Sequence, residues 1–179
     1  MKRRLSALAA LLTLLTGCGV SDTGPEPAGA VASGLERTGK REHFTRLYFI
    51  GVNGNQAVAR RTDGPAGPAQ AVRMLVEGPT EAERQRGLIT QVPDMSADLR
   101  VSAREGVVDL HLPVVIASGD LGTMALSQLV CTAAHADLPG NVAPDDVEVR
   151  VYELSESDPF PVRCNRFNIA QPAGVSTKD

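Results

Sequence analysis

The sequence has no tryptophan, two tyrosines, four phenylalanines and three cysteines, and it carries no excess of positive charge. Its 18 Lys and Arg residues face 21 Asp and Glu residues, so the formal net charge is −3. A nucleic-acid-binding surface needs a basic patch, usually with aromatic side chains placed between the charges. The composition therefore argues against nucleic acid as a partner.

The chain also lacks a long apolar run. The most apolar stretch, Leu5–Leu15, has about 11 residues, well short of the ~20 that a membrane-spanning helix needs. It follows the basic residues Lys2–Arg4 and runs into Leu15-Thr16-Gly17-Cys18. This order is typical of a secretory signal, here with the lipobox pattern of bacterial lipoproteins, and it predicts a signal peptide over residues 1–17.

The resemblance to a lipobox implies that Cys18 receives a diacylglyceryl group and becomes the mature N-terminus. Two acyl chains are enough to hold a protein stably on a bilayer. Without the three basic signal residues, 15 basic residues remain against 21 acidic ones, a formal net charge of −6, so the lipid must supply the membrane attachment. We therefore expect a protein on the extracytoplasmic face of the cell membrane. The alternative is an ordinary secreted protein in which Cys18 is coincidental.

Once Cys18 is assigned to the lipid, two cysteines remain, Cys131 and Cys164. In an exported domain, such a pair favours a disulfide. The alternative is two inert buried thiols.

Composition divides the mature chain into three parts. Residues 18–42 are rich in Gly, Pro, Ser, Ala and Thr without apolar periodicity, which predicts a lipid-anchored flexible linker. Residues 43–165 contain the apolar patterns of one domain with a core. Residues 166–179 are predicted to be a disordered tail.

Periodicity and turn signals predict the elements of the domain. Strands are expected at residues 44–52, 56–61, 99–103, 107–112 and 147–151, and helices at 68–77, 80–87 and 120–136. Asn53-Gly54 predicts a hairpin turn, and Thr80 and Glu83 have the spacing of a capping box. Pro159–Cys164 is predicted to be an edge segment. The order β-β-α-α-β-β-α-β indicates an α+β fold, a single two-layer domain with helices on one face of a largely antiparallel sheet.

The segment from Leu47 to Tyr152 resembles the GerMN domain, which occurs in sporulation and spore-germination proteins and in many small actinobacterial lipoproteins. The resemblance is carried by Leu47-Tyr48-Phe49, Arg60-Arg61, Leu75-Val76-Glu77-Gly78-Pro79, Ile89–Pro93, Val107–Leu110, Leu129–Thr132 and Val147-Glu148-Val149. It implies a GerMN-like fold and a role in assembly or regulation, without catalytic residues or a cofactor.

The residues themselves show no catalytic or metal-binding pattern. There is no Gly-x-Ser-x-Gly elbow, and neither the cysteines nor the histidines have the spacing of a zinc site. The three histidines, His43, His111 and His135, are interpreted as solvated, with His135 placed to stabilise a helix C-terminus. Two acidic positions are interpreted likewise: Glu83 on a solvated helix face, with Glu81 and Arg84 beside it, and Asp109 on a hairpin surface.

Two functions fit this pattern. The first is a lipid-anchored, non-catalytic domain that docks an envelope protein or helps to assemble a complex. The second is a binding protein for a cell-wall glycan or a small ligand. An envelope hydrolase is a third, weaker alternative, because the nucleophile and base that it needs are not evident.

Overall fold

The computed structural model describes residues 42–95, 97–115, 121–154 and 157–174. The signal peptide predicted over 1–17, Cys18 and nearly all of the predicted linker lie outside these residues, so what we expect of them stays a prediction. The first strand begins at His43, where the sequence predicts that the domain begins.

The N-terminal hairpin consists of β1 (His43–Gly51) and β2 (Gly54–Thr62), which form a two-stranded antiparallel sheet. Every residue of β1 has a partner in β2, from His43 opposite Thr62 to Gly51 opposite Gly54. Gly54 has a φ of +93°, a conformation that glycine adopts without strain, and this is why the predicted hairpin turn forms here.

A second sheet contains five strands in the order β3-β4-β5-β6-β7. Its strands are β3 (Arg100–Arg104), β4 (Val107–His111), β5 (Glu148–Tyr152), β6 (Phe160–Cys164) and β7 (Ala170–Pro172). Strands β4 and β5 are parallel and the other neighbours are antiparallel. The parallel pair arises because a helix crosses over between β4 and β5.

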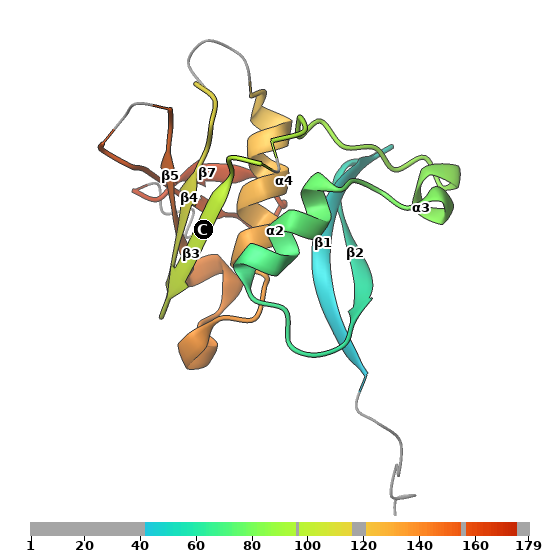
Figure 1. The fold of residues 1–179 in the computed structure, drawn as a ribbon, viewed down its shortest axis with the longest axis horizontal. Helices are drawn as coiled ribbons and strands as arrows, with labels where there is room; N and C mark the ends of the chain where they lie inside the picture. Colours follow the sequence, from blue (N-terminus) through green and yellow to red (C-terminus); the bar gives the residue numbers. More distant parts are fainter. Residues whose placement is uncertain (1–41, 96, 116–120, 155–156, 175–179) are drawn as a thin grey trace, which may run out of the picture. The chain divides into compact units, whose positions relative to one another are not determined.

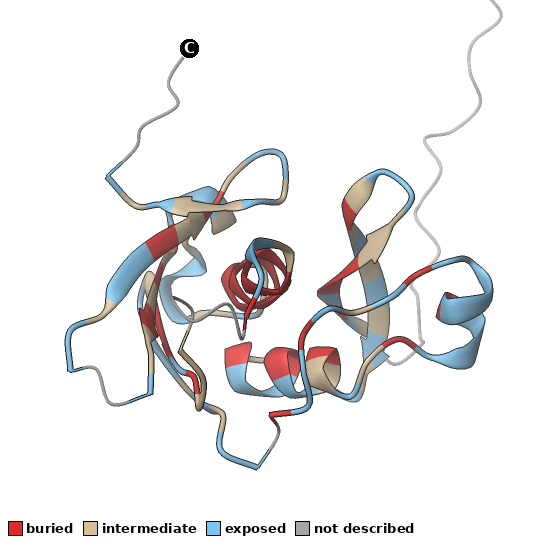
Figure 2. Cartoon of the chain, turned by 90° about the horizontal axis from the view of Figure 1, so that it is seen from above, coloured by how far each residue is buried: buried red, intermediate tan, exposed pale blue. Residues whose placement is uncertain are grey.

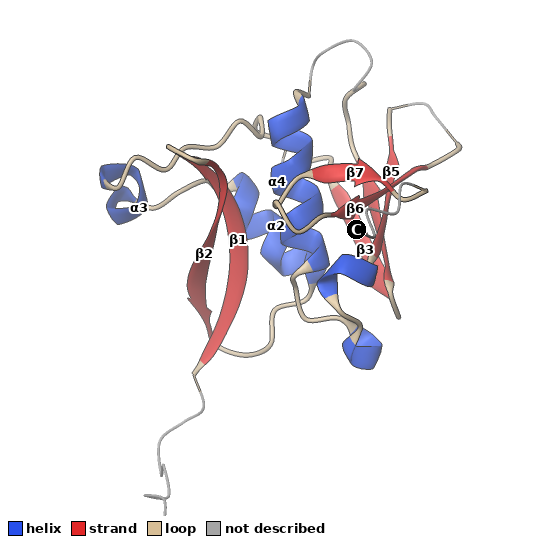
Figure 3. Cartoon of the chain, turned by 180° about the vertical axis from the view of Figure 1, so that it is seen from behind, coloured by secondary structure: helices blue, strands red, loops and turns tan. Residues whose placement is uncertain are grey.

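The main helices lie between the two sheets (Figures 1 and 3). The helices are α2 (Pro68–Val76), α3 (Glu81–Gln85) and α4 (Thr123–Ala134), with short 3₁₀ turns at Pro139–Asn141 and Pro144–Asp146. Both α2 and α4 contact β1 on one side and the five-stranded sheet on the other. The predicted α+β class and element order are therefore confirmed. The strands, however, form two sheets with α2 and α4 between them, where we expected one sheet covered on one face.

Helix α4 is buried around its whole circumference (Figure 2). The sequence predicts an apolar stripe that includes Leu126, Leu129 and Val130, but Ser127, Gln128 and Thr132 are buried as well. A helix with sheets on both sides has no solvated face, so its polar side chains must find partners inside the protein. Among the described residues, α4 is the longest helix, with 12 residues, and none of the helices there is long and apolar enough to cross a membrane.

The C-terminal prediction is corrected by β7. We expected residues 166–179 to be disordered, yet Ala170–Pro172 pairs with β6 over residues 162–164. The same pairing moves β6 away from the edge, where Pro159–Cys164 was predicted to lie. The short strand escapes sequence analysis because it has three residues and no alternating pattern, and it forms through pairing with β6.

Candidate functional site: the outer edge of the hairpin

The inner edge of the hairpin, on the side of β1 away from β2, is closed by other parts of the chain. Tyr48 donates its backbone N–H to the Thr132 hydroxyl at 3.1 Å and accepts a hydrogen bond from the Gln128 side-chain amide at 2.9 Å. Ile50 exchanges two backbone hydrogen bonds with Ile89, at 2.8 and 2.9 Å. The polar side chains of α4 thus make the hydrogen bonds to β1 that a neighbouring strand would otherwise make.

The outer edge, on the side of β2 away from β1, is open from Ala57 to Arg61, whereas Asn55 is buried and donates its side-chain amide to the Asn168 carbonyl at 2.8 Å. Because Tyr48 and Ile50 bond away from β2, their register partners Ala57 and Asn55 must direct their own backbone groups away from β1. The alternation continues at Ala59 and Arg61. In the described part of the chain, the backbone groups of these four β2 residues form no ladder with any strand.

The centre of this outer edge is small and uncharged. The side chains of Ala57 and Ala59 are exposed, and Val58 between them is partly buried against the core. Edge strands are usually blunted by proline, charged side chains or a bulge; β2 has no proline and no bulge, and its charges, Arg60 and Arg61, lie toward its C-terminal end. The backbone of β2 is therefore accessible to another strand.

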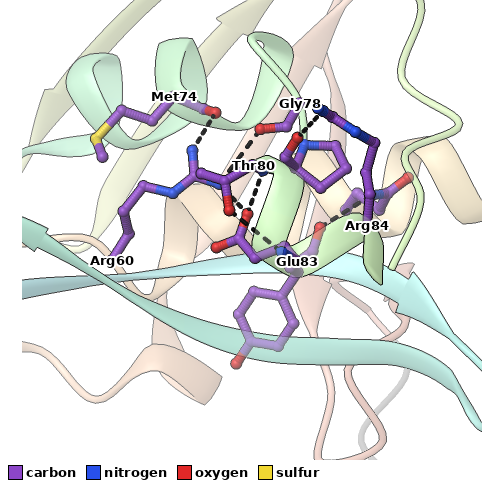
Figure 4. Close-up of polar contacts among 9 residues, drawn as sticks. Arg60, Met74, Gly78, Thr80, Glu83 and Arg84 are labelled. Carbon is purple, nitrogen blue, oxygen red and sulfur yellow. Dashed lines mark hydrogen bonds and ion pairs between the residues drawn. The ribbon is translucent and has the colours of Figure 1, made fainter. Parts of the chain in front are cut away.

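One arginine of β2 fixes the hairpin to the helices (Figure 4). Arg60 forms an ion pair with Glu83 and donates to the backbone carbonyls of Met74 and Gly78 at 3.2 and 3.3 Å. Its guanidinium also lies over the Phe49 ring, 5.4 Å from the centroid. Arg60 is thus a structural residue that holds β2 against the turn between α2 and α3.

The prediction that Glu83 lies on a solvated helix face is wrong, since the residue is 6% exposed. Its carboxylate accepts the Thr80 N–H at 2.7 Å and completes the predicted capping box. Burial raises the pKa of Glu83, but the bonds from Thr80 and Arg60 outweigh it and hold the pKa below its usual value. Glu81 and Arg84 remain exposed and pair with each other at 2.7 Å.

Asp109 is also buried, where we expected a hairpin surface residue. Its two carboxylate oxygens accept from Arg104 and Arg150, each at 2.7 Å. These arginines come from the neighbouring strands β3 and β5, so the cluster joins three strands of the larger sheet. Both oxygens of Asp109 are therefore used within the fold.

The three histidines lie in different places and do not form a site together. His43 begins β1, while His111 is exposed and stacks on the Tyr152 ring at 4.3 Å. His135 is half-buried against Tyr48, and its Nδ1 lies 2.9 Å from the Cys131 carbonyl, so it is not a solvated residue. Burial lowers the pKa of His135, and the contact with Cys131 partly opposes this effect. Among the described residues, no group of three His, Cys, Asp or Glu side chains could hold a metal ion.

The predicted disulfide is present. Cys131 in α4 and Cys164 in β6 are bonded, with their Cα atoms 4.9 Å apart and a sequence separation of 33. Both residues are at most 1% exposed. The bridge holds α4 against the larger sheet, and it thereby supports the helix that closes the inner edge of the hairpin.

An open groove of about 550 Å³ lies at one end of the larger sheet. It is lined by Asp98, Arg100, His111, Leu112, Pro113, Glu153 and Leu154. His111 lines this groove and its ring stacks on the Tyr152 ring, and Leu154 is an exposed apolar side chain. The groove thus combines polar and apolar groups, and sequence analysis had singled out only His111 among them.

Comparison with known proteins gives one structural likeness. No protein-family model and no curated protein matches the sequence. The chain is similar to a solved structure, the tandem GerMN domains of the sporulation protein GerM from Bacillus subtilis, with a TM-score of 0.49 and 19% sequence identity. The match covers 80% of this chain and 50% of that one, so the chain spans about half the length of the tandem protein.

Proposed function

We propose that this protein is a lipid-anchored lipoprotein on the extracytoplasmic face of the cell membrane. Its GerMN-like domain would act as a non-catalytic interaction and assembly domain. The observation that carries the proposal is the outer edge of β2, a nine-residue strand with one side unpaired among the described residues. An exposed edge binds an extended segment of another chain through main-chain hydrogen bonds, a common mode of protein recognition.

Membrane attachment completes this function. The lipobox Leu15-Thr16-Gly17-Cys18 and the linker predicted over 18–42 would hold the domain near the bilayer but leave it free to reach partners. Confinement of the domain to a surface raises its effective concentration at a confined partner, so a weak edge contact becomes sufficient.

The buried polar groups support a role in binding rather than in catalysis. Glu83 and Asp109 are neutralised by arginines, and Gln128 and Thr132 bond to the backbone of β1. A catalytic acid or base needs a carboxylate or imidazole that is free to reach a substrate. These side chains are instead engaged in holding the elements together.

Photo-crosslinking in intact membranes tests the proposal. A photoreactive amino acid in place of Ala59 should give a protein adduct, because its side chain lies at the centre of the outer edge. The same amino acid at the exposed position Ala82 on α3 is the matched control. Cys18→Ser should remove the acyl mass from the protein and reduce the Ala59 adduct. An Ala59 signal no stronger than the Ala82 signal would contradict docking at this edge.

The groove beside His111 favours a second candidate, binding of a cell-wall glycan or a small ligand. Sugars pack their C–H faces on flat rings and donate hydroxyls to carboxylates, and the groove offers His111 and Asp98. Titration with soluble cell-wall oligosaccharides should then perturb the NMR signal of His111, and His111→Ala should weaken binding. Shifts confined to residues outside the groove would reject this candidate.

A further inference from the structure

We infer that the outer edge of β2 pairs with β2 of a second copy of this chain, so that two hairpins form one four-stranded sheet. This inference rests on the proposed function, because it names the partner of the same edge. It starts from the direction of the backbone groups. Asn55, Ala57, Ala59 and Arg61 bond away from β1, and only a strand that offers the same alternation can meet them.

A second β2 offers this alternation when it runs antiparallel about an axis through Val58. In this register, Ala57 of one copy is opposite Ala59 of the other, and Asn55 is opposite Arg61. Each outward-bonding residue therefore meets another outward-bonding residue. The central Ala57–Ala59 pairs are accessible, and the outer Asn55–Arg61 pairs lie beside the contact of Asn55 with Asn168. The arrangement is isologous, as in most symmetric dimers, since each copy uses the same surface.

The side chains agree with this register. The central Ala57–Ala59 pairs are small and exposed, so two backbones can approach without a clash. On the opposite face, Val58 meets its own counterpart across the axis. Like charges directly opposite each other would destabilise a strand pair. Here Arg60 lies opposite Gln56, so no two like charges are directly opposed. Arg60 is in addition already neutralised by Glu83.

The other strand edges of the described chain are less suitable. The inner edge of β1 is closed by Thr132, Gln128 and Ile89. At one margin of the larger sheet, β7 has three residues and ends in Pro172. At the other margin, β3 has five residues, carries an arginine at each end and lies beside α2. The long uncharged centre is therefore a property of β2.

The dimer should be weak in solution and should depend on the membrane. One strand from each copy, with alanines at the centre, buries few large side chains, and stable complexes usually bury roughly 1,200–2,000 Å². Lipid anchoring would place both copies on one surface and raise their effective concentration. The inference thus expects dimers in membranes and mostly monomers after the lipid is removed.

Cysteine crosslinking of the full chain in native membranes tests the register. Two differently tagged copies, one with Ala57→Cys and one with Ala59→Cys, should form an interchain disulfide, because opposed residues of an antiparallel pair lie at bridging distance. Either variant alone should crosslink at least ten-fold less, since its cysteines are then diagonal. Ala82→Cys on α3 is the matched control. Equal crosslinking in all combinations would overturn the register.

A proline variant tests the main-chain bonds. Ala59→Pro removes an outward N–H that β1 does not use, and proline is tolerated at such edge positions. It should reduce, at least ten-fold, the interchain crosslinks between cysteines placed at Val58, which lies opposite its own counterpart in this register, with the circular dichroism spectrum unchanged. Ala59→Ser keeps the N–H and should retain them.

The results separate this inference from the proposed function. If the photoreactive Ala59 position captures only other envelope proteins and no second copy, the second-copy inference is rejected and the docking function stands. If that position captures no protein, both are rejected. If Ala59→Pro folds and still dimerises in the same register as Ala59→Ser, the strand-pairing inference is rejected.

Discussion

The two strands of the N-terminal hairpin have the same length and are paired residue for residue, but they have opposite environments. In β1, Leu47, Tyr48 and Phe49 are almost completely buried, whereas β2 has one buried residue, Asn55. The free edge of β1 is closed by α4 and that of β2 is open. The elements beside a strand therefore determine whether the backbone N–H and C=O groups of its free edge stabilise the fold or are available for binding.

The difference in environment follows from composition. β1 is apolar on both faces, as in a strand that is covered on both sides. Opposite the buried Leu47, Tyr48 and Phe49, β2 has Val58, Ala57 and Gln56, which are smaller or polar, so β2 buries less apolar surface. We therefore expect substitutions in β1 and its contacts to change stability, and those at the outer edge of β2 to change association.

The largest effect should come from truncation within the register pair Leu47–Val58. Leu47→Ala should cost about 2–5 kcal/mol of unfolding free energy, because the fully buried side chain leaves a cavity. Val58→Ala removes a partly buried group and should cost about 1 kcal/mol or less. Urea denaturation of both variants measures the two losses of unfolding free energy. Equal losses would contradict the proposed difference between the two strands.

Loss of the disulfide should weaken the helix that closes β1. Cys131→Ala with Cys164→Ala opens a link across 33 residues, which should cost about 3–4 kcal/mol in the chain-entropy model. Amide exchange at Tyr48 should then increase more than exchange at Val58. Chemical reduction of the wild-type protein is the control. A variant as stable as wild type would show that α4 is held without the bridge.

A smaller loss of stability should come from removal of the Thr132 hydroxyl, which accepts a hydrogen bond from the inner edge of β1. Thr132→Val keeps the shape of the side chain but leaves the Tyr48 N–H without its partner, at a cost of about 1–3 kcal/mol. Thr123→Val, at the exposed start of the same helix, is the matched control and should be close to neutral. Thermal unfolding of the two variants compares them directly. If the two variants were equally destabilised, the loss of stability in Thr132→Val would not come from its hydrogen bond to Tyr48.

The smallest effect should be a pH dependence from His135, which packs on Tyr48. Burial lowers the pKa of His135 in the folded protein, so the unfolded chain binds the proton more readily. The stabilisation is therefore complete above about pH 6.5 and is lost as the pH falls toward the folded-state pKa, below which the loss levels off. His135→Gln should reduce the slope of unfolding free energy against pH in this window. An unchanged slope would contradict the assignment.

Much of the fold could be predicted because its signals are local. The hairpin turn at Gly54, the capping box of Thr80 and Glu83, and the end of α2 before Gly78 all depend on residues within one or two turns of each other. The disulfide could be predicted from cysteine count and compartment. By contrast, β7 depends on pairing with β6 and left no periodic signal.

The candidate site was less predictable, because polar burial depends on distant partners. Glu83 looks solvated in its own helix, and it is buried because Arg60 on β2 reaches it. Asp109 looks exposed on its hairpin, and it is covered because β5 brings Arg150 beside it. Sequence analysis expected an exposed sheet edge or face for docking but could not say which one.

By itself, the sequence determined the α+β class, the order of its elements and the pairing of Cys131 with Cys164. These features depend on periodicity, on turn and cap residues, and on the number of cysteines. All of these can be read from the sequence without knowing which distant residues meet in the fold. Only the tertiary structure decided that α4 lies between two sheets and that the edge of β1 is closed while that of β2 is open. Each of these results depends on contacts between residues far apart in sequence, such as Thr132 with Tyr48, whose formation no local pattern records.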